Sequence, residues 1–403
     1  MALSFGGSVT VPIDFLGMNY IEYPVVGVSP VGLIRWKNLR VSQLPEAKWS
    51  TIETAAGVYN ASALANFDSI VTFQRQNGAS IYFGLYSTPT FYASAVANPT
   101  YGDSVTKGPW NNLGEGANPT SLPAVANFVT MIINRYNKPG GAWYDANGAT
   151  LGKGIQYWET WNEPGMDLLG NANVTGANGP CGAGRFFWGT PAQMIDVAQT
   201  QYAAIKATDS SIVVTTPGFS GFSTTVANAF LTTVGASTSK TGVQSCDAFA
   251  WHPYFMTPPG VSYGAWTTGD IIFGTWGVRV VKDWLASNGY SLPLWISEWG
   301  VDAGSATTTE IAWYAEAPSF RYTWIARFLM SCAAMGVKTV CPFHWKENGV
   351  VGHSGNWQQD TLGVQKAYND VSANVVGKTI TSSSYIPNGA VTLNFSDGSS
   401  WTV

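Results

Sequence analysis

Two glutamates define the chemistry that this sequence can perform. Glu163 lies in the segment YWETWNEP (157–164), and Glu298 lies in LWISEWG (294–300). Each follows a run of apolar residues that predicts a buried strand, so we expect each at the carboxyl end of a strand. Two carboxyl groups in unequal surroundings divide into an acid and a nucleophile, because burial favours the protonated form and hydrogen-bond donors favour the charged form. That division is the chemistry of a retaining glycosidase.

The surroundings of Glu163 favour the acid role. Pro164 ends the predicted strand, so the glutamate is expected to project from the strand end. Trp158 and Trp161 supply apolar neighbours that keep a carboxyl group protonated. The competing interpretation is a surface glutamate in an ion pair. Glu159 in the same segment is expected to hold a neighbour in place rather than to act directly.

The surroundings of Glu298 must favour the ionised form if it is the nucleophile. His252 and Tyr254 end the predicted strand before it and are the expected hydrogen-bond donors. The alternative for His252 is a core or loop histidine. Arg35 is a cation within an apolar strand and needs an acidic partner, either a catalytic or a structural carboxylate. Trp345, at the end of the last strand, is either a sugar platform or part of the rim packing.

Apolar runs and helical patterns alternate along the chain and predict an α/β fold. Eight buried strands separated by helices indicate a (β/α)8 TIM barrel over residues 1–373, followed by a small C-terminal β appendage over residues 374–403, a hairpin or partial sandwich. A doubly wound open sheet is the alternative, but no Gly-x-Gly-x-x-Gly turn follows the first strand. The expected strands are Phe15–Tyr20, Leu33–Leu39, Ser80–Leu85, Gly154–Trp161, Ile212–Thr216, Ala248–His252, Leu294–Ser297 and Thr339–His344.

Two long insertions carry aromatic residues. They follow the third and fourth predicted strands, over residues 86–120 and 165–190, where barrel loops form a substrate cleft. Aromatic rings on such loops suit sugar stacking, because the face of a pyranose is apolar. Tyr86, Trp110 and Trp188 are therefore expected to bind sugars beyond the scissile bond, and the alternative is that they pin the loops to the barrel.

Composition excludes several classes of partner. The net charge is -4 and no run of Lys and Arg is present, which argues against a nucleic-acid partner. No apolar stretch approaches the roughly 20 residues of a membrane helix, so no membrane insertion is expected. The segment from Met1 to Gly7 lacks the basic and apolar regions of a signal peptide. Few Lys and Glu with abundant Thr, Ser, Asn and Gly are typical of an extracellular or virion-associated protein.

The cysteines do not indicate a metal site. Cys181, Cys246, Cys332 and Cys341 show no C-x-x-C spacing and no interleaved histidine, so neither a metal nor another cofactor is expected. Cys332 and Cys341 lie in apolar runs and are expected to be buried thiols. A disulfide between the other two stays open.

Several motifs together resemble those of a known group of enzymes. They are WNEP at 161–164, ISEWG at 296–300, IRW at 34–36, Thr88-Pro89 and WGTPAQM at 188–194, where a helix opens. In this respect the chain resembles clan A glycoside hydrolases, and most closely the family 39-type group of β-xylosidases, α-iduronidases and bacterial exopolysaccharide-cleaving enzymes. The similarity runs in order over residues 15–370. Members of this group usually carry a complete β-sandwich, whereas this chain has little more than one hairpin, so we expect either that the tail pairs with the amino-terminal strand or that the natural protein continues.

The resemblance implies a role for each candidate residue. Glu163 would be the acid/base and Glu298 the nucleophile of a retaining O-glycosidase, endo-acting on a β-linked polysaccharide or exopolysaccharide. An exo-acting, xylosidase-like β-glycosidase and a catalytically silent carbohydrate-binding barrel are the alternatives. The other implied roles are a hydrogen bond to the sugar 2-hydroxyl for Asn162, a hydrogen bond to the nucleophile for Tyr254, and lining of the cleavage subsite for Arg35, Trp161, His252 and Trp345.

Overall fold

The computed structural model describes most of the chain as two compact units. One unit comprises residues 1–39 and 251–403, and the other comprises residues 40–250. Their boundaries fall within β3 (Asn38–Arg40) and β10 (Phe249–His252), and each unit is described by itself. The described residues are 7–19, 37–41, 44–93, 116–164, 187, 189–220, 224–255, 277–301, 317–342, 362–386 and 390–403.

The unit of residues 40–250 is built on a parallel sheet. β6 (Ser80–Gly84), β7 (Tyr157–Glu159) and β8 (Val213–Thr215) lie side by side in that order, and Tyr82 pairs with Tyr157 and Tyr157 with Val213. Beyond β3, the Val41 amide donates to the Tyr82 carbonyl at 3.0 Å. These strands read as continuous apolar runs because helices bury them, as expected for parallel strands.

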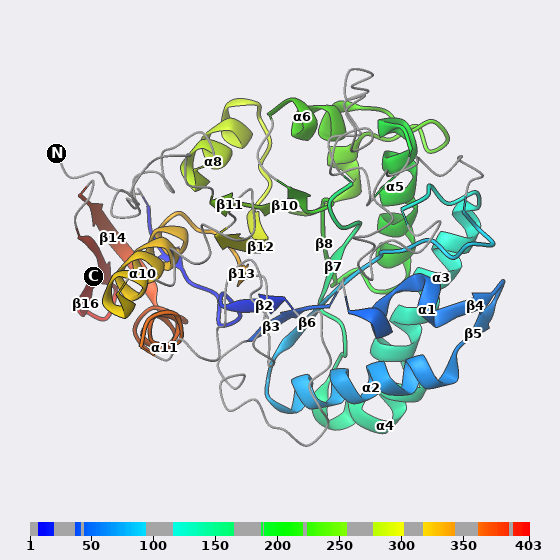
Figure 1. The fold of residues 1–403 in the computed structure, drawn as a ribbon, viewed down its shortest axis with the longest axis horizontal. Coiled ribbons are helices and arrows are strands. Elements are labelled where there is room, and N and C mark those ends of the chain that lie inside the picture. The colour runs from blue at the N-terminus through cyan, green and yellow to red at the C-terminus, as the bar shows by residue number, and fades with distance from the viewer. Residues whose placement is uncertain are drawn as a thin grey trace. The chain divides into compact units, whose positions relative to one another are not determined.

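Helices of this unit begin and end at the residues that the sequence indicates. The helix α2 (Ala61–Gln76) is capped by Asn60, whose side chain accepts hydrogen bonds from the Ser62 and Ala63 amides, and it ends before Gly78, which has a φ of +71°. α5 opens with a capping box between Thr190 and Gln193. The helices, which surround the strands in Figure 1, are α1 (Trp49–Ile52), α2 (Ala61–Gln76), α3 (Leu122–Asn137), α4 (Ala142–Leu151), α5 (Pro191–Thr208) and α6 (Thr224–Thr232).

Short elements complete this unit. The strands β4 and β5 form an antiparallel hairpin, and the short strand β9 follows β8 along the chain. Two 3-10 helices lie near the first and the last residues of the unit in the sequence. These elements are β4 (Glu53–Ala55), β5 (Val58–Tyr59), β9 (Phe219–Ser220), η2 (Pro45–Ala47) and η4 (Gly242–Ser245).

The second unit has its own parallel strands. β12 (Leu294–Val301) pairs in parallel with β11 (Tyr254–Phe255) and with β13 (Val340–Pro342). β2 (Gly17–Asn19) extends the set, because Leu16 forms a parallel bridge with Val340. The helices of this unit are α8 (Val278–Ser287), α10 (Pro318–Ala334) and α11 (Val364–Asn374).

The C-terminal residues form an antiparallel sheet that includes the start of the chain. Its order is β1-β14-β15-β16, and Val9 of β1 pairs with Ile380 of β14. This pairing confirms the expectation that the tail pairs with an amino-terminal strand. The sheet packs on α10, while the division of the chain at residue 373 stays a prediction. The strands are β1 (Val9–Thr10), β14 (Thr379–Tyr385), β15 (Val391–Phe395) and β16 (Ser400–Thr402).

Each of the eight expected strands overlaps an observed strand, although β3 and β12 continue past the expected ends to Arg40 and Val301. The observed strands are generally shorter, and the expected start of the second one lies outside the described residues. Cys332 and Cys341 are buried free thiols as expected, and Cys246 is a third; Cys181 lies outside the described residues. Within the described part of the chain, no helix combines the length and the apolar character needed to cross a membrane.

Candidate active site

Glu163 lies beyond the end of β7 rather than on it, which corrects the expectation from sequence. β7 ends at Glu159, and the following residues run beside the segment after β8. There the Gly218 amide donates to the Trp161 carbonyl at 3.1 Å, and the Glu163 amide donates to the Gly218 carbonyl at 3.0 Å. The half-buried Glu163 has a φ of +40°. Non-glycine residues adopt such a φ at a cost in free energy, and they cluster at functional sites.

The two tryptophans near Glu163 are fully buried. Trp158 packs on Phe83 with ring centroids 4.6 Å apart, and its indole nitrogen donates to Gln201 at 2.8 Å. The Trp161 ring packs edge to face against Phe187, with centroids 5.5 Å apart. These contacts fix the backbone that leads to Glu163. The role of Trp161 in a sugar subsite stays a prediction.

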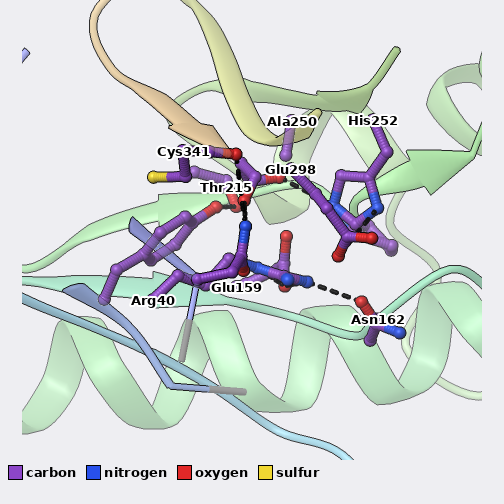
Figure 2. A network of polar contacts seen from close by, with 12 residues as sticks. Arg40, Glu159, Asn162, Thr215, Ala250, His252, Glu298 and Cys341 are labelled. Atoms are coloured by element: carbon purple, nitrogen blue, oxygen red, sulfur yellow. Dashed lines mark hydrogen bonds and ion pairs between the residues drawn. The ribbon is translucent and has the colours of Figure 1, made fainter. Parts of the chain in front are cut away.

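A buried ion pair holds Asn162, the residue before Glu163. Arg40 binds one carboxylate oxygen of Glu159 through Nε at 2.9 Å and through Nη2 at 2.5 Å, and Nη2 also donates to Asn162 Oδ1 at 2.5 Å (Figure 2). The side chains of Arg40 and Glu159 are 0% exposed. Because a buried guanidinium requires an anionic partner, Glu159 binds Arg40, and Arg40 orients Asn162.

The sequence prediction found half of this network. Glu159 does hold a neighbour in place, and that neighbour is Arg40. The strand cation was assigned to Arg35, which lies outside the described residues, while Arg40 was missed. A usable signal was present, because Arg40 directly follows Leu39 at the end of the same apolar run and a glutamate on another predicted strand needed a partner.

Glu298 lies within β12, not at its end, because the strand continues to Val301 and pairs there with β11. The pairing of β12 with β13 shifts register around Glu298. Ile296 faces Val340 and Trp299 faces Pro342, so three steps along β12 match two along β13. This is a β-bulge, a feature that redirects side chains and is frequent next to active sites. The carboxylate is buried, with the residue 3% exposed.

His252 lies beside Glu298, as expected for a neighbour of this carboxylate. Its Nδ1 is 3.7 Å from a carboxylate oxygen of Glu298, and its Nε2 is 2.9 Å from Ser297 Oγ. The imidazole, drawn beside the Glu298 carboxylate in Figure 2, is fully buried. An imidazole N–H that faces the carboxylate favours its ionised form. The backbone of Tyr254 lies on β11, its side chain is not described, and Trp345 lies outside the described residues.

Neighbouring strands and helices fix β12 on both sides of Glu298. Asn19, at the end of β2, donates from Nδ2 to the carbonyls of Ser297 at 2.9 Å and of Cys341 at 3.2 Å. Asn19 was not predicted, although it is a polar residue closing an apolar run. On the other side, Trp299 Nε1 donates to the Tyr368 hydroxyl at 3.2 Å. Burial raises the pKa of Tyr368 well above its ordinary value, so this hydroxyl stays neutral.

The expected aromatic platforms are only partly within the described residues. Tyr86 is fully buried and packs against Trp161, with the two ring centroids 6.2 Å apart. It therefore offers no exposed face, which corrects its assignment as a sugar platform. Trp110 and Trp188 lie outside the described residues.

The candidate residues fall in two sets. Trp161, Asn162 and Glu163 belong to the unit of residues 40–250, and His252, Tyr254 and Glu298 belong to the other unit. Each set combines one carboxyl group with polar neighbours that fix its backbone or its charge. The distance between Glu163 and Glu298 stays a prediction.

Comparisons with known proteins show the fold. No protein-family model and no curated protein sequence matches the chain. Among solved structures, the chain is similar to AbfB, a family 51 α-L-arabinofuranosidase from Bifidobacterium longum, with a TM-score of 0.57 and 13% identity over 96% of this chain and 80% of that one. A glucosidase from Croceicoccus marinus has a TM-score of 0.56 and 14% identity over 100% and 83%. A monomeric β-xylosidase from Caulobacter crescentus has a TM-score of 0.55 and 15% identity over 96% and 74%.

These similarities fix the architecture. The chain has the α/β fold of TIM-barrel glycosidases, with parallel strands, surrounding helices and a C-terminal antiparallel sheet. It is structurally similar to clan A glycoside hydrolases, which confirms the fold class expected from sequence. The identities are too low to assign a family within the clan, so the resemblance to the family 39-type group stays an expectation.

Proposed function

We propose that the protein is a retaining O-glycoside hydrolase, endo-acting on a β-linked polysaccharide or exopolysaccharide. The observation that carries the proposal is Glu298, a buried carboxylate on a bulged strand with the imidazole of His252 at 3.7 Å. A protein core tolerates such a carboxylate only with compensating partners. The similarity of the fold to that of glycosidases supports a role as the nucleophile.

The reaction takes two steps. In the first, the carboxyl group of Glu163 gives its proton to the glycosidic oxygen while Glu298 attacks the anomeric carbon, so that the bond to the leaving sugar breaks and a glycosyl ester forms. In the second, Glu163 removes a proton from water, the water oxygen attacks the anomeric carbon, and the Glu298 carboxylate leaves.

The remaining residues position substrate and carboxylates. Asn162, which Arg40 orients, hydrogen-bonds the sugar 2-hydroxyl, and Tyr254 donates to the nucleophile. The cleavage subsite is lined by Arg35, Trp161, His252 and Trp345. No metal or cofactor takes part in the proposed steps.

Two measurements test the mechanism. A reducing-sugar assay over a panel of β-linked polysaccharides identifies a substrate, and proton NMR of the first product formed reports its anomeric configuration. Retention of the β configuration is the expected result. A fluorinated glycoside of the same sugar should add one glycosyl mass to wild type, but not to Glu298→Ala. An inverted product would exclude the double displacement, and an absence of cleavage with intact polysaccharide binding would favour a silent binding barrel.

An exo-acting β-glycosidase is the second candidate. It is favoured by the burial of Tyr86, which was one of three rings expected to bind sugars beyond the scissile bond. The two modes differ in their dependence on chain length. Endo action gives a kcat/KM that rises with the number of sugar units and a rapid fall in polymer viscosity. Exo action gives monosaccharide from the first turnover.

A further inference from the structure

The bulge in β12 places two consecutive side chains beside the imidazole ring of His252. In a regular strand, successive side chains point to opposite faces of the sheet. Here Ser297 Oγ is 2.9 Å from His252 Nε2, and the next residue, Glu298, has a carboxylate oxygen 3.7 Å from Nδ1 of the same ring. The extra residue of β12 opposite β13 accounts for this arrangement, and such bulges are rare between parallel strands.

The two contacts of the ring differ in kind. The distance to Ser297 is that of a hydrogen bond, whereas 3.7 Å to Glu298 is too long for one. The Ser297 hydroxyl can accept a hydrogen bond from Nε2 or donate one to it, and each choice goes with a different protonated nitrogen of a neutral imidazole. If the hydroxyl accepted from Nε2, the lone pair of Nδ1 would face the Glu298 carboxylate and repel it. If the hydroxyl donates to Nε2, the Nδ1 proton faces the carboxylate and stabilises its charge.

We propose that Ser297 is a positioning residue that donates its hydroxyl hydrogen bond to His252 Nε2 and thereby holds the His252 proton on Nδ1, toward Glu298. The assignment of Glu298 as a nucleophile rests on the proposed function, but the tautomer of His252 does not. All three side chains are buried, with Ser297 and His252 at 0% exposure. The hydrogen bond from Asn19 to the Ser297 carbonyl at 2.9 Å fixes the backbone of the bulge.

The test measures directly which ring nitrogen of His252 carries the proton. The chain has three histidines, His252, His344 and His353, so the nitrogen signals of protein labelled with 15N-histidine can be assigned by comparison with His252→Gln. In wild type near neutral pH, we expect a protonated Nδ1 and an unprotonated, hydrogen-bonded Nε2. Ser297→Ala should shift the population toward the Nε2-protonated form. The kcat on a β-glycoside should fall about fivefold to tenfold, the effect of one lost hydrogen bond, with less change in KM.

Ser331→Ala is the matched control. Ser331 is a fully buried serine on α10 whose hydroxyl has no hydrogen-bond partner among the described residues. Ser331→Ala removes the same hydroxyl group as Ser297→Ala, but from another core position. Thermal stability can therefore change, whereas the His252 signals and kcat should not.

The outcomes separate the two proposals. A wild-type His252 that is protonated on Nε2 alone, or on both nitrogens, would overturn the tautomer assignment, even if Ser297→Ala fails to fold. Unchanged His252 signals in a folded Ser297→Ala would overturn the role of Ser297. If the expected signals are found but no polysaccharide is cleaved, the hydrogen-bond arrangement stands and the proposed function fails.

Discussion

At the scale of single residues, the buried carboxylates have different partners and therefore different predicted effects on mutation. Glu298 has a histidine at ion-pair distance, whereas Glu159 binds a guanidinium directly. A direct, buried ion pair is typical of a structural role, and a buried carboxylate beside an imidazole is typical of chemistry. Mutation of Glu298 should therefore lower activity, whereas mutation of Glu159 should lower stability.

Replacing Glu298 should affect turnover alone. Glu298→Gln keeps the shape of the side chain but removes the nucleophile, so kcat should fall by at least about 10⁴-fold while substrate affinity changes less than about threefold. Calorimetric titration with an oligosaccharide substrate measures binding, and product release measures turnover. Loss of binding together with turnover would indicate that Glu298 has a structural role.

Breaking the Arg40–Glu159 pair should destabilise the fold. Arg40→Met or Glu159→Gln leaves the partner charged and buried, which costs about 3 to 5 kcal/mol of the free energy of unfolding. The control is Arg279→Met, because Arg279 pairs with Asp283 where the side chains are 40% and 58% exposed. That change should cost about 1 kcal/mol or less. Equal costs for the two pairs in urea unfolding would contradict the assignment.

The sequence singled out both glutamates and His252 as candidates because polar residues stand out at the ends of apolar runs. It could not identify the partners that long-range packing selects. Arg35 lies on an expected strand and Arg40 directly follows its last residue, and only the fold pairs Arg40 with Glu159. Asn19 was missed because its partners are backbone carbonyls, which have no signal in the sequence.

At the scale of elements, the sequence located the strands but not their ends. Apolar runs predict that a strand exists, whereas its length depends on how far the neighbouring strand continues. Thus β7 stops before Glu163, and β12 runs past Glu298 because β11 pairs with it. The bulge in β12 depends on the register with β13, which no local pattern encodes.

Asp209 connects three elements and should make stability depend on pH. It ends α5, and it accepts hydrogen bonds from Asn137 of α3 at 3.0 Å and from Lys153 before β7 at 2.8 Å. Burial by itself would raise the pKa of Asp209, but the hydrogen bonds from Lys153, Ser211 and Asn137 outweigh it and lower this pKa to about 2.

Because the folded-state pKa lies below that of the unfolded chain, Asp209 stabilises the fold above about pH 4. This contribution, about 2 kcal/mol, should be lost as the pH falls from about 4 to 2. Asp209→Asn should be less stable than wild type at pH 7, and the two should converge near pH 2. The control is Asp283→Asn, whose side chain is 58% exposed. Parallel pH profiles for wild type and Asp209→Asn would contradict the prediction.

At the scale of the whole molecule, alternating strands and helices were enough to predict the fold class. Eight buried strands with helices between them leave few architectures, and the absence of a dinucleotide-binding turn disfavoured the open sheet. The sugar and the mode of action were not predictable, because they depend on loops rather than on the barrel.

The retaining mechanism predicts a distance. In a crystal structure of the protein, the carboxyl groups of Glu163 and Glu298 should be about 5 to 5.5 Å apart, because the nucleophile must reach the anomeric carbon directly. A separation of about 6.5 to 9.5 Å would leave room for a water molecule and would favour inversion. The same crystals soaked with a fluorinated glycoside should show a sugar bonded to Glu298.

The division of the chain into a continuous and an interrupted unit has a consequence for synthesis. Residues 40–250 are contiguous in sequence and form a unit of their own, whereas residues 1–39 are grouped with residues 251–403, which are synthesised much later. At about 5 to 20 residues per second, synthesis of residues 251–403 takes roughly ten to thirty seconds. During that interval Phe15, Leu16 and Met18, which are at most 1% exposed in the folded protein, lack their partners. We therefore expect residues 1–39 to depend more on chaperones during synthesis than residues 40–250.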